Sequence, residues 1–217
     1  MKGPPGLEHR LRPSDGEPQG ALVLMHGRAT DENDLFPLLD VFDPHHRLVG
    51  LTPRGPLTFP PGGRHWYAVE RIGFPEPGTF MDTWATLTAW VDAIPQALGV
   101  PLERTVLGGF SQGGVMAYAL ALATGRPAPA GVLALSTFIP TVDGIAIDVD
   151  AAAGLPVAIF HGTRDGVIGV EWGRSARDAL EAAGAAVTFR ESPVSHTLDP
   201  RELPTYTRWL AGVLPAA

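Results

Sequence analysis

A serine between glycines is the part of the sequence best suited to chemistry. Ser111 stands at the centre of the pentapeptide Gly-Phe-Ser-Gln-Gly at residues 109–113. Residues 104–107 before it are typical of a short buried strand, and residues 112–123 are typical of a helix rich in Ala and Gly. A strand that turns into a helix within a few residues strains the serine backbone and lifts its hydroxyl into the open. The pattern predicts a nucleophile at Ser111. The alternative is an ordinary turn that holds a small polar residue.

A serine hydroxyl is a poor nucleophile at neutral pH, so it needs a base within hydrogen-bond reach and a third group that orients the base. Asp165 and His196 follow Ser111 in the chain order Ser, Asp, His. Asp165 comes directly after a predicted strand and can orient one imidazole nitrogen of His196 while the other nitrogen faces Ser111. Asp143, in the preceding loop, is the alternative acid.

The remaining nucleophiles and bases are poorer candidates. His26 and His161 immediately precede glycines at predicted strand ends, where a histidine more often braces a loop than acts as a base. The sequence has no cysteine, which excludes a cysteine nucleophile, thiolate zinc sites and disulfides. Its one lysine, Lys2, lies in the N-terminal tail, so Schiff-base chemistry is not expected. We expect neither a metal nor a cofactor.

Acyl transfer at a serine passes through an oxyanion, and each preorganised N–H donor lowers the barrier by about 3 kcal/mol. Gln112 offers one backbone N–H at the start of the predicted helix, where the helix dipole also favours negative charge. We expect the second donor in the loop after His26, at Arg28. The Arg28 side chain is either a solvated surface group or a contact for an anionic substrate.

The elements that must position these residues alternate between strand and helix from residue 20 onward. Residues 52–79 are dense in Pro and Gly, and such a long irregular stretch is usually functional or mobile. Apolar runs predict strands at 7–11, 21–25, 47–51, 104–107, 131–135, 155–160 and 186–190. Helical spacing predicts helices at 31–42, at 80–98 with a kink or break at Pro95, at 112–123, at 171–183, and at the end, starting at Pro200 or Pro204.

This alternation predicts an α/β fold with a mostly parallel central sheet and helices on both faces. Ligands of such sheets bind beyond the carboxyl ends of the strands. Each candidate follows a predicted strand end. This holds for the loop that contains Arg28 and for the residues Ser111, Asp165 and His196. We therefore expect them to meet at one rim of the sheet.

Composition bounds the rest. The 217 residues, 45% of them hydrophobic, suit a single domain over 1–217, with 1–19 as a short N-terminal edge segment. The formal charge of −7 opposes binding to nucleic acid or to anionic membranes, both of which need a basic face. Since neither a secretory signal nor an apolar run long enough to span a membrane is present, we expect a cytoplasmic protein. The oligomeric state, monomer or homodimer, stays open.

Four motifs together resemble the phospholipase/carboxylesterase family of small α/β-hydrolases, over roughly residues 20–212. They are His-Gly at 26–27, Gly-Phe-Ser-Gln-Gly-Gly at 109–114, His-Gly-Thr-Arg-Asp at 161–165 and Ser-His at 195–196. The family includes carboxylesterases, lysophospholipases and acyl-protein thioesterases. The resemblance implies an α/β-hydrolase fold without a separate cap domain. For the site it implies nucleophile Ser111, acid Asp165, base His196, and oxyanion donors Arg28 and Gln112.

Two positions depart from the family pattern. Ala29 replaces the second glycine of the common His-Gly-x-Gly, and Ser195 stands where a glycine often precedes the histidine. Both departures bear on substrate preference. The resemblance also implies that Trp66, Phe74, Ile168 and Leu198 form the walls of an acyl pocket, although each is equally compatible with the core.

The function that these residues predict is hydrolysis of small-molecule carboxylic esters or thioesters with small or linear acyl groups, through an acyl-enzyme on Ser111. One alternative is a non-catalytic binding module of the same fold that recognises a small hydrophobic ligand. Another is a dienelactone-type hydrolase, which usually has a cysteine nucleophile.

Overall fold

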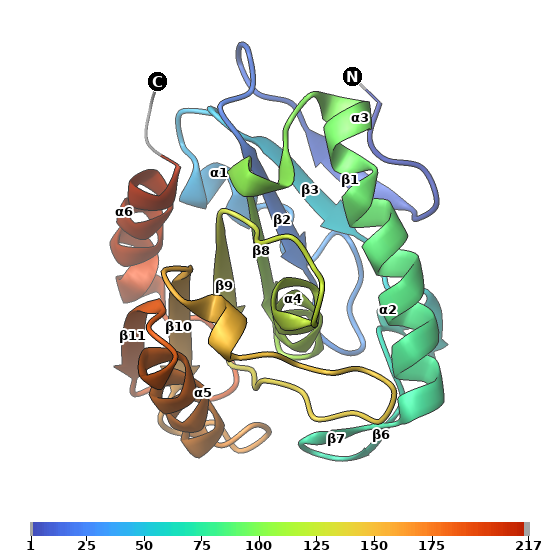
Figure 1. Cartoon of the computed structure of the whole chain (residues 1–217), viewed down its shortest axis with the longest axis vertical. Coiled ribbons are helices and arrows are strands. Elements are labelled where there is room, and N and C mark those ends of the chain that lie inside the picture. Colours follow the sequence, from blue (N-terminus) through green and yellow to red (C-terminus); the bar gives the residue numbers. More distant parts are fainter. Residues whose placement is uncertain (1, 215–217) are drawn as a thin grey trace.

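The computed structural model describes residues 2–214, which are built on a seven-stranded sheet (Figure 1). Neighbouring strands are parallel, except that the first strand pairs antiparallel with β3 at one edge. The predicted mostly parallel sheet is therefore confirmed. In spatial order the strands are β1 (His9–Arg12), β3 (Val49–Pro53), β2 (Ala21–Met25), β8 (Thr105–Phe110), β9 (Gly131–Leu135), β10 (Pro156–Gly162) and β11 (Ala186–Ser192).

The central strands are continuous apolar runs because both of their faces are covered. Every residue of β2 is buried, and alternate side chains enter different cores: Val23 packs on one face of the sheet and Leu22 and Leu24 pack on the other. One core lies under α2 (Pro77–Asp92), α3 (Ile94–Leu98), α4 (Gln112–Leu122) and α5 (Val170–Ala182). The other lies under α1 (Leu38–Phe42) and α6 (Leu203–Val213).

Helix α4 packs against β8, β9 and β2 in the middle of the sheet (Figure 1). All of its residues are buried, which explains why its sequence is apolar on every side. Its small residues let the helix lie close to the strands. The first residue of α4 directly follows Ser111, so the most buried helix of the fold also carries the candidate nucleophile.

Proline residues determine where α2 ends and where α6 begins. The predicted long helix divides at Ala93 into α2 and α3, since Pro95 lacks the N–H that a continuous helix needs. At the C-terminal end both predicted starts are used: the 3₁₀ turn η3 (Pro200–Glu202) precedes α6, which has Pro204 in its first turn. The other 3₁₀ turns are η1 (Leu102–Arg104) and η2 (Asp150–Ala152).

The predicted helix at 31–42 is wrong over its first half. Only α1 is helical, and residues 31–37 form turns. The Asp31 side chain accepts a hydrogen bond from the Asn33 backbone N–H at 2.9 Å, a local bond that competes with helix formation. Pro37, which directly precedes α1, also disfavours a helical conformation at the residue before it.

The irregular stretch at 52–79 contains two small antiparallel hairpins and the start of α2. One pairs β4 (Leu57–Phe59) with β5 (Gly63–His65), and the other pairs β6 (Val69–Arg71) with β7 (Phe74–Pro75). Both lie outside the central sheet. Among residues 2–214, no helix has both the length and the apolar character that a membrane crossing requires.

Candidate active site

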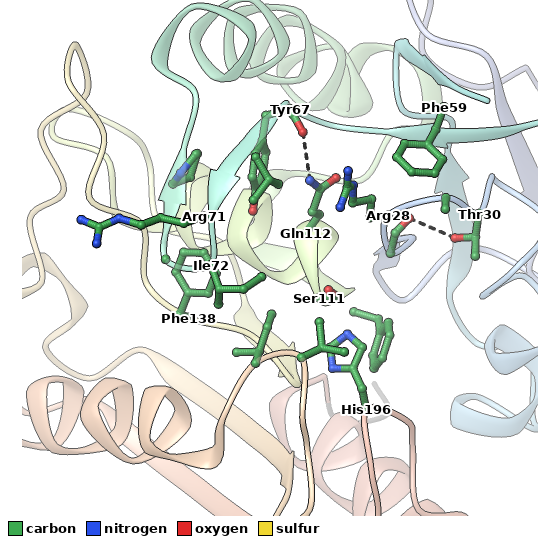
Figure 2. A pocket seen from close by; sticks show the side chains of 18 of the residues that line it. Arg28, Thr30, Phe59, Tyr67, Arg71, Ile72, Ser111, Gln112, Phe138 and His196 are labelled. Carbon is green, nitrogen blue, oxygen red and sulfur yellow. Dashed lines mark hydrogen bonds between the residues drawn. The ribbon is translucent and has the colours of Figure 1, made fainter. Parts of the chain in front are cut away.

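The residues expected at the carboxyl edge of the sheet come together there. Arg28 follows β2, Ser111 follows β8 and His196 lies in the loop after β11, and all three line one cavity of about 320 Å³ (Figure 2). Asp165, which follows β10, lies behind His196 and is hydrogen-bonded to it. The parallel strands thus bring residues more than 160 positions apart in the sequence to the same place.

The backbone at Ser111 has an unusual conformation, with φ of 53° and ψ of −119°. Such a φ is costly for any residue with a Cβ, so the surroundings must hold it. The Ser111 N–H donates to the Leu135 carbonyl at 2.9 Å, and the Thr137 hydroxyl donates to the Ser111 carbonyl at 2.9 Å. A Cβ at Gly113 would lie 2.1 Å from the Met25 carbonyl oxygen, so only glycine permits this approach of α4 to β2. The turn therefore has the strained strand-to-helix geometry that the pentapeptide predicts.

Asp165 holds His196 in one orientation. The Oδ2 atom of Asp165 lies 2.6 Å from Nδ1 of His196, while Oδ1 accepts the backbone N–H groups of Val167 and Ile168 at 2.9 and 2.8 Å. The Asp165 side chain is fully buried, whereas 18% of the His196 side chain is exposed. The Phe110 ring packs on the imidazole with the ring centroids 4.6 Å apart. Nε2 of His196 remains for Ser111, beside which the ring lies in Figure 2.

The competing residues occupy other roles. Asp143, the alternative acid, is exposed in the loop after β9 and forms no ion pair with a described residue. His26 braces a loop, since its Nε2 accepts the Gly55 N–H at 2.9 Å, and burial lowers the pKa of His26 and favours the neutral form. His161 also braces a loop, through a 2.8 Å bond from Nε2 to the Ile168 carbonyl. The expectation that both histidines support loops is confirmed.

Arg28 and Gln112, the expected oxyanion donors, both line the cavity. Gln112 is the first residue of α4, so its N–H has no partner within the helix. The loop of Arg28 is fixed by a bridge to β5, in which the Ala29 N–H donates to the Arg64 carbonyl at 2.8 Å and the Arg64 N–H donates to the Thr30 carbonyl at 2.7 Å. The backbone N–H groups of Arg28 and Gln112 thus belong to segments held next to Ser111.

The Gln112 side chain has a role that the sequence did not reveal. Its Oε1 accepts the Trp66 N–H at 3.1 Å, and its Nε2 donates to the Tyr67 carbonyl at 2.9 Å (Figure 2). The amide therefore ties residues 66–67 to the start of α4. Because the tied segment continues into β6, this amide also positions the hairpin beside the cavity.

We expect Gln112→Leu to lower the free energy of unfolding by about 1 to 3 kcal/mol, because it leaves the buried Trp66 N–H unpaired and leaves the Tyr67 carbonyl with only the 3.2 Å contact to Nδ1 of His65. Urea unfolding measures the change. Gln96→Leu is the matched control, since Gln96 is exposed on α3, and it is expected to stay within about 0.5 kcal/mol of the wild type. Equal stability of the two variants would contradict the role of the amide.

Ala29 departs from the family pattern at a strained position. Its φ is 69°, in the left-handed region that favours glycine. We expect Ala29→Gly to raise the free energy of unfolding by about 1 kcal/mol, because relief of the Cβ clash exceeds the added freedom of the unfolded chain. Ala85→Gly, at an exposed site within α2, is expected to lower it by about 1 kcal/mol. Chemical denaturation of both variants would show the opposite signs, and a loss of stability in both would refute the strain at Ala29.

The predicted pocket walls are partly corrected. Phe74 and Ile168 line the cavity, but Trp66 and Leu198 do not. Trp66 is fully buried in the core, where its Nε1 donates to the His26 carbonyl at 2.8 Å, and Leu198 packs into the core under α6. The two side chains thus belong to the two cores on opposite faces of the sheet. The other large apolar residues that line the cavity are Phe59, Tyr67, Val69, Ile72, Pro75, Phe110, Phe138 and Val167.

Comparison with known proteins places this site in a family. The family model described as Phospholipase/Carboxylesterase matches residues 9–213. Lysophospholipase-like protein 1 of Mus musculus is 32% identical over 120 residues, which cover 54% of this chain, and the match spans about half, 50%, of the length of that relative. Acyl-protein thioesterase 1 of Emericella nidulans is 36% identical over 196 residues, which cover 84% of this chain and 80% of the fungal protein.

A solved structure agrees with the fold. The carboxylesterase from Mesorhizobium loti superposes with a TM-score of 0.83 at 23% sequence identity, covering 95% of each chain. At this identity the likeness establishes the fold alone, which is the α/β-hydrolase fold. Since the family model matches almost the whole length, the chain belongs to the phospholipase/carboxylesterase family.

Proposed function

We propose that the protein is a serine hydrolase of carboxylic esters or thioesters, with Ser111 as nucleophile, His196 as general base and Asp165 as the acid that orients His196. The observation that carries the proposal is the 2.6 Å bond between Asp165 and His196, in a cavity that Ser111 also lines. A buried carboxylate on Nδ1 holds the tautomer whose Nε2 can accept the serine proton, and it stabilises the imidazolium that forms.

In the first half of the reaction, the Ser111 hydroxyl attacks the acyl carbonyl and His196 takes its proton. The negative charge moves to the carbonyl oxygen, where the backbone N–H groups of Gln112 and Arg28 can bind it. His196 then gives its proton to the departing alcohol or thiol. In the second half a water molecule, deprotonated by His196, attacks the acyl-enzyme, and the acid leaves as Ser111 regains its proton.

The acyl group is expected to occupy the apolar side of the cavity. Ile72 and Phe74 of the β6–β7 hairpin line this side, together with Phe138, Val167 and Ile168. A cavity of about 320 Å³ is at the small end of ligand pockets, which favours small or linear acyl groups. The choice of ester and thioester bonds rests on the relatives, which include proteins named thioesterase and lysophospholipase-like.

Hydrolysis of 4-nitrophenyl esters from acetate to palmitate tests the proposal, with chelator present and between about pH 5 and pH 9. We expect turnover that resists the chelator, that favours the shorter chains, and that rises with pH, as a reaction that depends on a general base does. S-acyl thioesters of the same chain lengths rank the two bond types. The absence of turnover on every ester and thioester, together with tight reversible binding of them, would favour a non-catalytic binding protein instead.

A further inference from the structure

The cavity at Ser111 differs in polarity on its two sides. Figure 2 shows Ile72 and Phe138 on one side of Ser111, and Arg28 and Phe59 on the other. The first side is apolar apart from Arg71, whose guanidinium stacks on the Phe74 ring, and it suits the acyl group. The second side is formed by the loop after β2, residues 27–30, with Phe59 and Asp34. It therefore faces the part of a substrate that is not the acyl group.

Arg28 presents a free positive charge on this second side. Its side chain is exposed, and among residues 2–214 it forms neither an ion pair nor a hydrogen bond. Its Cζ lies 4.6 Å from the centroid of the Phe59 ring, and this stacking restrains the guanidinium without using its N–H donors. Asp34 is the one acidic residue among those that line the cavity, and it is not within ion-pair distance of Arg28.

The charge of Arg28 opposes the general charge of the protein. The chain carries a formal charge of −7, which repels anionic molecules at long range. Among the residues that line the cavity, by contrast, the two arginines Arg28 and Arg71 outnumber the one acid, Asp34. Burial lowers the pKa of the neighbouring His65 most, and the positive charge of Arg28 adds to that lowering. The Arg28 charge thus acts on this side of the cavity without being neutralised by an ion pair.

We propose that the Arg28 side chain binds an anionic group, a carboxylate or a phosphate, on the leaving group of the substrate. A guanidinium matches both groups because it donates two parallel N–H bonds to two of their oxygens. The substrates are then esters or thioesters whose alcohol or thiol carries such an anion. This inference rests on the proposed function, since it assigns the leaving group of that same reaction.

Matched acetate esters test the proposal in the intact 217-residue chain. The neutral reference is the methyl ester of 3-acetoxybenzoate. The anionic ester 3-acetoxybenzoate has a phenolic leaving group of the same kind and differs from the reference in charge. In a third ester, 3-acetoxyphenyl phosphate, a phosphate replaces the carboxylate. Each kcat/KM is divided by the rate of hydrolysis by hydroxide, which removes the intrinsic reactivity. We expect the wild type to prefer at least one of the anionic esters by about tenfold, the factor that a charged hydrogen-bonded pair provides, and the preferred ester identifies the anion.

The preference, not the absolute rate, is compared among variants, because the backbone of Arg28 also serves as an oxyanion donor. Arg28→Gln is expected to abolish the preference and Arg28→Lys to keep part of it. Asp34→Asn is expected to raise it about twofold, since it removes a negative charge from the same side. Arg71→Gln is the matched control: Arg71 also lines the cavity, but it stacks on Phe74 on the acyl side, and its loss is expected to leave the preference unchanged.

The two proposals can fail separately. Hydrolysis of the methyl ester that depends on Ser111, without any preference for an anionic ester, would overturn the role of Arg28 and leave the proposed hydrolase intact. A preference that survives in Arg28→Gln but is lost in Arg71→Gln would also overturn it. Failure to hydrolyse any of these three esters, together with failure on the 4-nitrophenyl esters and the S-acyl thioesters, would overturn both proposals.

Discussion

The Ser111→Ala variant is expected to lose about 10⁵- to 10⁶-fold in kcat for ester hydrolysis, as far as the background rate permits measurement. The reason is chemical, because the other aliphatic hydroxyl that lines the cavity, that of Thr30, donates to the Gly27 carbonyl at 3.0 Å in its own loop. His196 is fixed by Asp165, and the chain contains no cysteine. The activity that remains would come from the oxyanion donors and from binding.

The stability of Ser111→Ala is expected to stay within about 0.5 kcal/mol of the wild type, because the Ser111 hydroxyl donates no hydrogen bond to a described residue and its backbone bonds are kept. Urea unfolding measured beside the activity separates a lost nucleophile from a lost fold. Activity within tenfold of the wild type would refute the assignment of Ser111.

A second variant uses the backbone strain at the same position. Ser111→Gly is expected to be as inactive as Ser111→Ala but more stable by about 1 kcal/mol, because glycine adopts a φ of 53° without a Cβ clash. Both variants lack the hydroxyl, so the difference between their unfolding free energies is the strain less the added freedom that glycine gives the unfolded chain. Equal stability of the two would mean that the strain at Ser111 does not exceed this freedom.

The sheet was predictable because its strands are buried on both faces. In β2, β9 and β10 the apolar runs end close to the observed strand ends, and Ser111, Asp165 and His196 lie in the loops after β8, β10 and β11. For parallel strands this is sufficient to predict that Ser111, Asp165 and His196 converge. Both Asp143 and Asp165 lie between Ser111 and His196 in the chain, so the preference for Asp165 came from its place just after a predicted strand.

The details that depend on tertiary contacts were not predictable. The pattern at 31–42 is periodic, but a local side-chain bond at Asp31 and a proline at 37 override it. Trp66 and Phe74 come from the same Pro- and Gly-rich stretch, and sequence gives no indication that one enters the core while the other faces the cavity. The Gln112 side chain is tied to Tyr67, 45 positions earlier, by a contact that no local pattern contains.

The Asp165→Asn variant is expected to lose about 10³- to 10⁴-fold in kcat through the wrong tautomer of His196. In the wild type Oδ1 of Asp165 accepts two backbone N–H groups and Oδ2 faces Nδ1 of His196. An asparagine has one accepting oxygen, and the backbone N–H groups of Val167 and Ile168 need it. The NH₂ group of the asparagine must then face Nδ1 of His196, which becomes an acceptor. The imidazole proton therefore moves to Nε2, and a protonated Nε2 can no longer accept the proton of Ser111.

This argument separates orientation from charge. Asp165→Ala removes the charge and also leaves two backbone N–H groups without their acceptor, so it is expected to cost about 2 kcal/mol or more of stability, whereas Asp165→Asn keeps both bonds and the fold. Asp143→Asn is the control, since Asp143 is an exposed acid of the preceding loop, and its kcat is expected to stay within about twofold of the wild type. A tenth or more of wild-type activity in Asp165→Asn, or an equal loss in Asp143→Asn, would mean that a group other than Asp165 orients the base.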